Sequence, residues 1–462
     1  MSRIRRITLS GGALALGAAA TALAGGIVAG ADGIGDDFFP KAGNGGYQVD
    51  RYDVDLRYRA SGRVRVIEVI EAEATPGPGL SSFNLDFRGP RIKVVKVNGA
   101  PARFERHGPE LVISPPGGLL PAAGFRVRIV FAGRPHKVTD PDGSKEGWAE
   151  TPDGAVAASE PLGTTSWLAV NDHPQDKAAY RIELTTPRRL LGISNGELAR
   201  RSSTDRTRTT VWKQPDPMAS YLAVVAIGRF EIDRGTIAGI PYLAAADAGF
   251  PRRVLTSLKR RTRAAHACLT GVAGPYPFQS TGGIVDPSSL GFALEAQTRS
   301  YYPGPPSRDL VVHEIAHQWF GDSVSVMWWD QIWLNEGFAT YMEWLCEERS
   351  GGWRTQRTFN RLYADHGPAD SAFWNPPPAA LPGPERLFAD SVYERGAMAL
   401  EVLRQRIGEN DFFEVLERWA AENRNGNVTT DDLLALVMTV SGGPVPAAFE
   451  EWLYEPGRPA KP

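Results

Sequence analysis

The chain has 462 residues, of which 42% are hydrophobic and 23% are charged, and its formal net charge at pH 7 is −2. A chain of this length is too long for one compact core, so two or three domains are expected. The near balance of charge argues against a nucleic-acid partner and gives no sign of a strongly charged substrate.

Residues 1–31 have the composition of an export signal. Arg5 and Arg6 precede an uncharged stretch, residues 7–31, that is rich in Ala, Gly and Leu. The arginine pair is typical of the twin-arginine route, although Thr8 stands where a bulky apolar residue is usual. We therefore predict a protein that is exported, and either secreted or associated with the cell envelope. The stretch is also long enough to span a bilayer, so an uncleaved anchor is the alternative, and membrane contact is expected only in that case.

The pattern changes to β after the leader. Apolar and polar residues alternate in residues 52–58 and again in 125–131, which is typical of half-buried strands. The Asn-Gly pair at 98–99 predicts a hairpin. Residues 135–160 are polar and rich in Gly, Pro and Asp, which predicts a long surface loop. We expect an antiparallel β-domain over residues 45–247.

Helical periods dominate residues 248–462, which we predict to form a mainly helical catalytic domain. Apolar residues share one face of a predicted helix at 252–269, and further helices are expected at 392–407 and 412–421. Thr429 and Asp432 form a predicted capping box that opens a last helix.

Cys268 and Cys346 are the only two cysteines. In an exported protein they could form a disulfide. Each also lies in an apolar, helix-like context, where a buried free thiol is common. Both alternatives stay open on the sequence.

The most informative motif is HEIAH, which contains His313, Glu314 and His317 and is followed, after eighteen intervening residues, by Glu336. On a helix, positions i and i+4 share a face, so both imidazoles can reach one ion. Two histidines and one carboxylate leave an open position on Zn²⁺ for water, which predicts one catalytic zinc per chain. Glu314 is then the predicted general base.

The surroundings of the motif favour a metal site over a plain core helix. Apolar residues flank the histidines, Ser307 is a predicted N-cap, and Gly321 is a predicted helix stop. Without a metal, two histidines and a glutamate in a buried helix would cost several kcal/mol of desolvation.

These residues resemble the M1 family of zinc aminopeptidases, whose members share HExxH, eighteen residues and a glutamate. Further blocks match in order along the mature chain: WLAVNDHPQDK at 167–177, SNG at 194–196, MASYL at 218–222, FALEA at 292–296 and YERG at 393–396. The resemblance implies an α+β multidomain fold, in which an N-terminal antiparallel β saddle domain precedes a thermolysin-like zinc peptidase domain.

The resemblance also implies roles for three further residues. Glu295 stands on the glutamate of the family's GAMEN block, which binds the free α-amine of the substrate. Glu160, twelve residues before Asp172, is expected to help it. Tyr393 stands on the tyrosine that donates a hydrogen bond to the developing oxyanion.

Some positions depart from the family pattern. FALEA keeps only the alanine and glutamate of GAMEN, so recognition of the amine could differ. Thr340 stands four residues after Glu336, where a carboxylate often supports a metal-bound histidine. Glu343 is the nearest substitute for that carboxylate, and an ordinary helix salt bridge is an equal alternative. The sequence also ends after the catalytic domain, so we expect a more open cleft, or one closed by a partner.

We therefore predict a zinc aminopeptidase that acts on peptides with a free N-terminus. Two alternatives are an epoxide-opening hydrolase, as in one branch of the family, and a catalytically weak or inactive peptide-binding surface protein that keeps the fold. The preferred N-terminal residue and the oligomeric state do not follow from the sequence.

Overall fold

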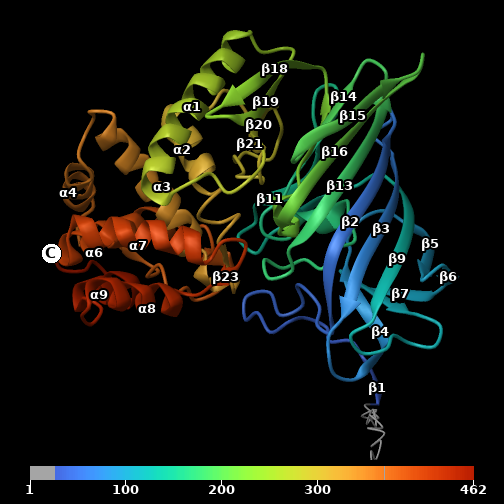
Figure 1. Cartoon of the computed structure of the whole chain (residues 1–462), viewed down its shortest axis with the longest axis horizontal. Coiled ribbons are helices and arrows are strands. Elements are labelled where there is room, and N and C mark those ends of the chain that lie inside the picture. Colours follow the sequence, from blue (N-terminus) through green and yellow to red (C-terminus); the bar gives the residue numbers. More distant parts are fainter. Residues whose placement is uncertain (1–25, 369, 462) are drawn as a thin grey trace, which may run out of the picture.

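The computed structural model describes residues 26–368 and 370–461. A β-rich N-terminal half lies beside a helical C-terminal half, as Figure 1 shows, and this confirms the α+β class. Residues 1–25 of the predicted export signal are not among the described residues. Across the described part of the chain, every helix is too short or too polar to cross a membrane.

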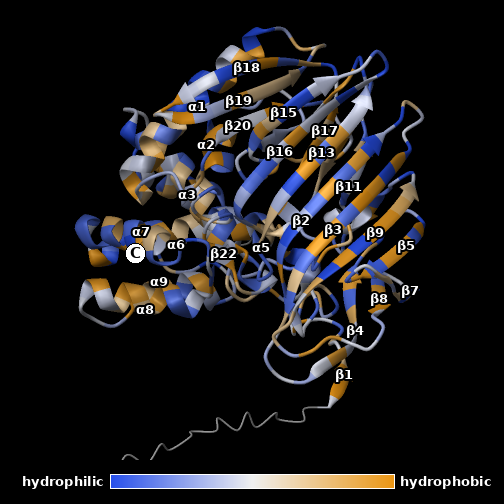
Figure 2. Cartoon of the chain, turned by 45° about the vertical axis from the view of Figure 1, so that its right-hand side comes forward, coloured by the Kyte–Doolittle hydropathy of each residue, from blue (hydrophilic) through white to orange (hydrophobic). Residues whose placement is uncertain are grey.

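The largest sheet has eight strands and is antiparallel apart from the β13–β2 pair. In spatial order the strands are β15 (Glu197–Ser203), β16 (Thr207–Met218), β13 (Ala178–Pro187), β2 (Tyr47–Tyr58), β3 (Val64–Ala74), β9 (Gly124–Gly133), β5 (Ile92–Val97) and β6 (Ala100–Pro101). The predicted alternation of apolar and polar residues is confirmed in β2. Val54 and Leu56 are buried, whereas Arg57, on the opposite face of the strand, is exposed. Figure 2 shows the same alternation of apolar and polar positions along β2, β3 and β9. Asn98 and Gly99 both have positive φ and form the predicted hairpin.

Two smaller sheets complete the N-terminal half. One contains β1 (Ile27–Ala29), β4 (Gly79–Asp86), β8 (Glu110–Ser114) and β7 (Arg103–His107). The other contains β10 (Lys137–Thr139), β11 (Lys145–Glu150), β12 (Ala155–Ala158), β17 (Val225–Gly228) and β14 (Leu191–Ser194).

The prediction of a long surface loop at residues 135–160 is wrong. Three strands of the second small sheet, β10 to β12, come from this segment, and all of 155–158 is buried. Most of the turn-forming residues lie in two short turns, 140–144 and 151–154, while Gly147 lies inside β11 and the apolar residues beside it pack into the core. Trp148 is one of these buried residues.

A mixed sheet of four strands lies beside α1 (Arg253–Ala273) in the upper part of Figure 1. It contains β18 (Phe230–Ile237), β19 (Ile240–Asp247), β20 (Thr281–Val285) and β21 (Ser300–Tyr302). The division predicted between residues 247 and 248 falls inside this sheet, because β19 pairs with β20. The domain boundary itself stays a prediction. The pairing of β19 with β20 joins β18 and β19 to the helical half in one sheet.

The helices of the C-terminal half pack around α3 (Trp333–Arg349), whose residues 333–342 are all buried. The others are α1 (Arg253–Ala273), α2 (Arg308–Ala316), α4 (Thr355–Asp365), α5 (Ser371–Trp374), the π-helix η5 (Ser391–Arg395), α6 (Gly396–Ile407), α7 (Glu409–Glu422), α8 (Thr430–Ser441) and α9 (Ala447–Tyr454). Thr429 and Asp432 form the predicted capping box of α8.

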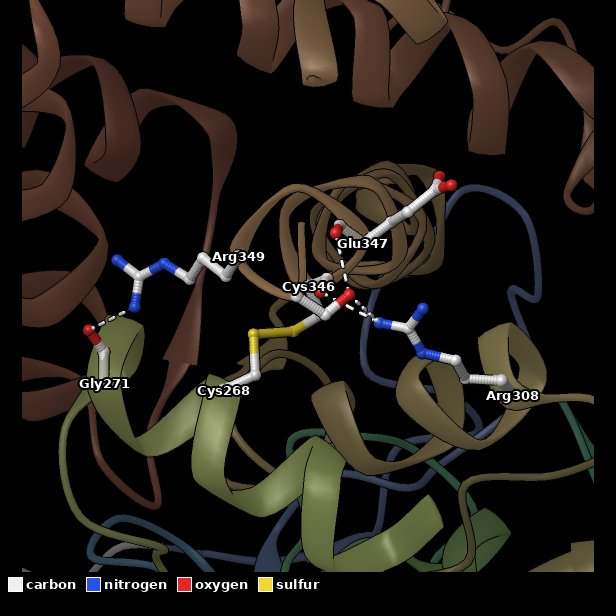
Figure 3. The surroundings of a disulfide bond; sticks show 7 residues. Cys268, Gly271, Arg308, Cys346, Glu347 and Arg349 are labelled. Carbon is white, nitrogen blue, oxygen red and sulfur yellow. Dashed lines mark hydrogen bonds between the residues drawn. A yellow bond between two sulfur atoms is a disulfide. The ribbon is translucent and has the colours of Figure 1, made fainter. Parts of the chain in front are cut away.

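Cys268 of α1 and Cys346 of α3 form a disulfide, which resolves the two alternatives that the sequence left open. Figure 3 shows that Arg308 of α2 approaches the same point and donates to the carbonyl oxygen of Cys346 over 3.0 Å. The three helices α1, α2 and α3 are therefore tied together at one place.

The two halves meet along the block at residues 167–177. The Nζ of Lys177 donates to the carbonyl oxygens of Asp322 at 3.2 Å and Gly426 at 2.9 Å. The carboxylate of Asp36 accepts the N–H of Trp329 at 2.9 Å. Because each of these hydrogen bonds joins a residue of the β-rich half to a residue of the helical half, together they hold the two halves against each other.

Candidate metal centre

Helix α2 presents the HEIAH motif in a fully buried setting. It begins after Ser307, whose Oγ accepts the N–H of Leu310 at 3.0 Å, as the N-cap prediction requires. His317 lies just past the last helical residue, but its N–H still donates to His313, so both imidazoles keep the i, i+4 relation. Gly321 has φ 143°, and a Cβ there would lie 3.1 Å from Nδ1 of His317. Glycine at this point lets the chain turn without displacing the imidazole.

The three predicted ligands converge. Oε2 of Glu336 lies 3.0 Å from Nε2 of His313 and 3.4 Å from Nε2 of His317. Each of the three residues offers one ligand atom, and these atoms all lie within 4.8 Å of one another. This donor set, two imidazoles and a carboxylate, fits Zn²⁺ with an open fourth position.

The outer nitrogens of both imidazoles are also occupied. Nδ1 of His313 lies 2.8 Å from Oε1 of Glu343, and Nδ1 of His317 lies 3.1 Å from the carbonyl oxygen of Phe320. Such partners fix the ring orientation and keep Nε2 free to bind a metal. Glu343 was expected either to support a metal-bound histidine or to form an ordinary helix salt bridge. In the structure it contacts and supports His313. Thr340, at the position usual for that carboxylate, lines the cavity instead.

The charges of the ligands are mutually stabilised. Burial alone would raise the pKa of Glu336. The two imidazoles instead lower this pKa to about 2. Burial opposes the charge on His313, but Glu336 and Glu343 raise its pKa well above the ordinary value. Because a metal ion would take the place of these protons, metal binding to the cluster should depend on pH.

Glu314 points into the same cavity. Its side chain is 4% exposed, and its Oε2 has no hydrogen-bond partner among the described residues. Burial raises its pKa to about 8, and the nearby Glu295 and Glu336 add to the shift. A carboxyl group in this range can both accept and return a proton near neutral pH.

Tyr393 lies on the π-helix η5 beside the ligands. Its ring stacks on that of His313 with centroids 6.1 Å apart. Burial raises its pKa well above the ordinary value, so the hydroxyl stays a donor. The neighbouring Arg395 is fully buried and donates to carbonyl oxygens at the C-terminal end of the chain, including that of Trp452 at 2.8 Å. Tyr393 is therefore held on an anchored turn.

Glu295 and Glu160 form an acidic pair next to the ligands. Glu295 is 3% exposed, and each of the two has a buried Oε1 without a hydrogen-bond partner in the described chain. Burial raises the pKa of Glu160 well above its usual range, and repulsion by Glu295 is the next largest cause. Two such carboxylates form a receptor for a cation such as an ammonium group.

All seven residues singled out in the sequence line one cavity of about 740 Å³. The cavity also has walls that sequence analysis missed: Asp142, Ser144, Leu362, His366, Phe373, Phe388, Asp390 and Glu394 are among them. Asp142 and Ser144 come from the turn between β10 and β11, inside the segment mistaken for a surface loop.

Comparison with known proteins agrees with this geometry. The profile of the Peptidase family M1 domain matches residues 292–452, which include the three ligands, Glu314 and Tyr393. The chain is 25% identical over 340 residues to Aminopeptidase M1-D of Oryza sativa subsp. japonica, covering 67% of this chain and 38% of that protein. It is 24% identical over 308 residues to the Tricorn protease-interacting factor F2 of Thermoplasma acidophilum, covering 62% and 39%. The chain thus spans less than two fifths of the length of these curated relatives.

Solved structures of similar size also match. The M1 zinc metallopeptidase of Deinococcus radiodurans is 28% identical with a TM-score of 0.83, covering 93% of this chain and 98% of that one. Variants of a two-domain M1 zinc metallopeptidase with the same 28% identity were solved with L-tryptophan or L-arginine bound, and a variant of the Deinococcus radiodurans M1 zinc metallopeptidase was solved with a Tyr-Ser-Ala substrate. The fit of the His313, His317 and Glu336 cluster to zinc agrees with these neighbours.

Proposed function

We propose that this chain, which matches the Peptidase family M1 domain over residues 292–452 and resembles the two-domain M1 zinc metallopeptidases in fold, is a zinc-dependent aminopeptidase. The observation that carries the proposal is the meeting of three groups in one cavity: the metal ligands, the unpartnered carboxylate of Glu314, and the acidic pair of Glu295 and Glu160.

The acidic pair accounts for cleavage at the N-terminus. A peptide N-terminus is a cation at neutral pH. Glu295 and Glu160 would hold it, so the first peptide bond comes to lie beside the metal ligands. A peptide whose amine is blocked loses this interaction and leaves the two carboxylates buried without a partner, which costs binding energy.

The chain supplies the remaining groups of a hydrolysis. Zinc bound by His313, His317 and Glu336 would act as a Lewis acid toward the scissile carbonyl and the attacking water. Glu314 takes a proton from that water and returns it to the leaving amine. The hydroxyl of Tyr393 donates a hydrogen bond to the oxygen that gains negative charge.

The comparisons support this proposal. The curated relatives in rice and in Saccharomyces cerevisiae carry aminopeptidase names. The structural neighbours bind single amino acids and a tripeptide. Ligands of this size agree with a cavity of 740 Å³, because binding pockets of about 300–1,000 Å³ suit small ligands. The composition of residues 1–31 supports export as the place of action.

One assay tests the function. The purified protein is incubated with aminoacyl chromogenic amides, both free and N-acetylated, with and without a zinc chelator. We expect release from the free amides alone, and its loss on chelation. Release from acetylated substrates would contradict the roles of Glu295 and Glu160. Absence of release from every substrate, with zinc bound, would support a peptide-binding protein instead.

A further inference from the structure

The cavity is more acidic than its proposed chemistry requires. Eight of its lining residues are Asp or Glu, and its lining includes neither Lys nor Arg. Glu336, Glu314, Glu295 and Glu160 have roles above, and Glu343 supports His313. Three acids remain unexplained, which are Asp142, Asp390 and Glu394. A cleft lined by one sign of charge concentrates ligands of the opposite sign.

Glu394 is the most shielded of these three. It follows Tyr393 on η5, and its Oε2 is screened from solvent without a hydrogen-bond partner in the described chain. Burial raises its pKa to about 7, and repulsion by Glu343 adds to the shift. A shielded carboxylate without a partner is costly, and a cation placed beside it removes that cost.

Two basic side chains that act electrostatically on Glu394, Arg361 and His366, make their direct contacts with other groups. The guanidinium of Arg361 lies over the ring of Trp353 at 5.1 Å. His366 stacks on Phe373 and its Nδ1 lies 2.6 Å from the carboxylate of Asp370. No ion pair with Glu394 occurs within residues 26–368 and 370–461.

The remaining walls suit a long amphipathic side chain. Leu310, Leu362, Phe373 and Phe388 line the cavity together with Glu394 and Asp390. Lysine and arginine combine an apolar stem with a charged tip, and they lay the stem on apolar surface while the tip reaches a polar group. The pairing of apolar walls and a shielded acid therefore matches these two residue types.

We propose that the cavity selects peptides with a lysine or arginine next to the scissile bond, and that Glu394 is the residue that pairs with the cationic side chain. The inference rests on the proposed aminopeptidase function. It adds a substrate class that the near-neutral net charge of the whole chain did not suggest.

Matched substrates test the selection. Arginyl and citrullinyl amides have the same shape and differ in charge, as do peptides beginning Leu-Arg and Leu-citrulline. The first pair places the cation at the N-terminal residue and the second pair places it one residue later. We expect kcat/KM to favour arginine roughly tenfold to hundredfold in one of the two pairs, as for a hydrogen bond to a charged group. Equal kcat/KM within both pairs would overturn the inference and leave the aminopeptidase proposal standing.

Variants identify the acid responsible. Glu394→Gln keeps the shape and removes the charge, so the arginine-to-citrulline ratio should fall toward one. Asp365→Asn removes an exposed acid of α4 that does not line the cavity, and it should keep the ratio of the unmodified protein. A Glu394→Gln protein that keeps the full ratio would overturn the role of Glu394.

Binding separates this inference from a failure of the function. In zinc-loaded Glu314→Gln protein, calorimetry reports selection without turnover, with free L-arginine against L-citrulline and with Leu-Arg against Leu-citrulline. Tighter binding of the arginine ligand in either pair supports the inference even if no substrate is cleaved. Equal affinities within both pairs, or no binding of any of the four, would overturn it.

Discussion

Oε1 of Glu343 lies 2.8 Å from Nδ1 of His313, two turns along α3 from the ligand Glu336. This contact orients the imidazole and raises its basicity. Replacing Glu343 with Gln should weaken zinc binding by about 10–100-fold, which is the usual effect of losing such a partner. Competition with a chromophoric chelator measures the change.

The matched control for this prediction is Glu347→Gln on the same helix. Glu347 does not line the cavity, so its replacement should leave zinc affinity unchanged. If both variants bind zinc like the unmodified protein, the contact between Glu343 and His313 contributes nothing to the metal site.

Glu314→Gln should separate metal binding from catalysis. The side chain is not among the three converging ligands, so zinc content should stay at one ion per chain. Loss of a general base usually costs about 10²–10⁴ in rate. We expect kcat on aminoacyl amides to fall by that amount, measured beside metal analysis of the same sample. A variant with normal kcat would remove Glu314 from the mechanism.

The residues of the metal centre could be predicted from the sequence because their relation is local or periodic. His313 and His317 are one helical turn apart, and Glu336 follows at a fixed spacing on the next helix. Glu295, Glu160 and Tyr393 were found only through ordered blocks that resemble a family. Nothing in their own surroundings distinguishes them from ordinary surface residues.

The walls of the cavity could not be predicted, because they come from segments with no sequence relation to the motif. Asp142 lies on a turn of the β-rich half and Phe373 on the short helix α5, yet both line the metal cavity. The disulfide could not be predicted for the same reason. Its formation depends on a Cα–Cα distance of 5.8 Å between α1 and α3, which is set by packing across 78 residues of chain.

Tyr393→Phe should lower kcat while leaving KM nearly unchanged. The hydroxyl is proposed to act on charge that exists only in the transition state, and the loss of one such donor costs about 10²–10³ in kcat. The ring that stacks on His313 is retained, so zinc content should not change. Steady-state kinetics on one free aminoacyl amide gives both constants. A rise in KM at constant kcat would show that Tyr393 binds the substrate and does not stabilise the oxyanion.

Glu68 of β3 should make the stability of the fold depend on pH. It is fully buried, its Oε2 accepts the N–H of Ala169 at 3.0 Å, and burial raises its pKa to about 8. Because the folded pKa lies above the unfolded pKa of 4.5, the folded protein binds more protons between these values. Stability is therefore lost as pH rises from 4.5 toward 8.

Glu68→Gln removes this titration and keeps an acceptor for Ala169. We expect the variant to gain stability over the unmodified protein as pH rises, by on the order of 3 kcal/mol near pH 7. Urea unfolding of both proteins at pH 5 and pH 8 measures the difference. A gap between them that is the same at both pH values would contradict a raised pKa at Glu68.

Removal of the disulfide should destabilise the helices that carry the metal ligands. The bond between Cys268 and Cys346 closes a segment of 78 residues, for which the chain-entropy model gives about 4.5 kcal/mol. The double variant C268A/C346A should lose roughly 2–5 kcal/mol of unfolding free energy. Arg308 still donates to the backbone oxygen at position 346, so α2 and α3 should stay in register at room temperature. Zinc content should then be normal at 25 °C and should be lost at a lower temperature than in the unmodified protein. Thermal unfolding with and without a reducing agent provides the control, because reduction should lower the Tm of the unmodified protein alone. An unmodified protein whose Tm is insensitive to reduction, with a double variant equally stable, would show that the bridge does not support the metal centre.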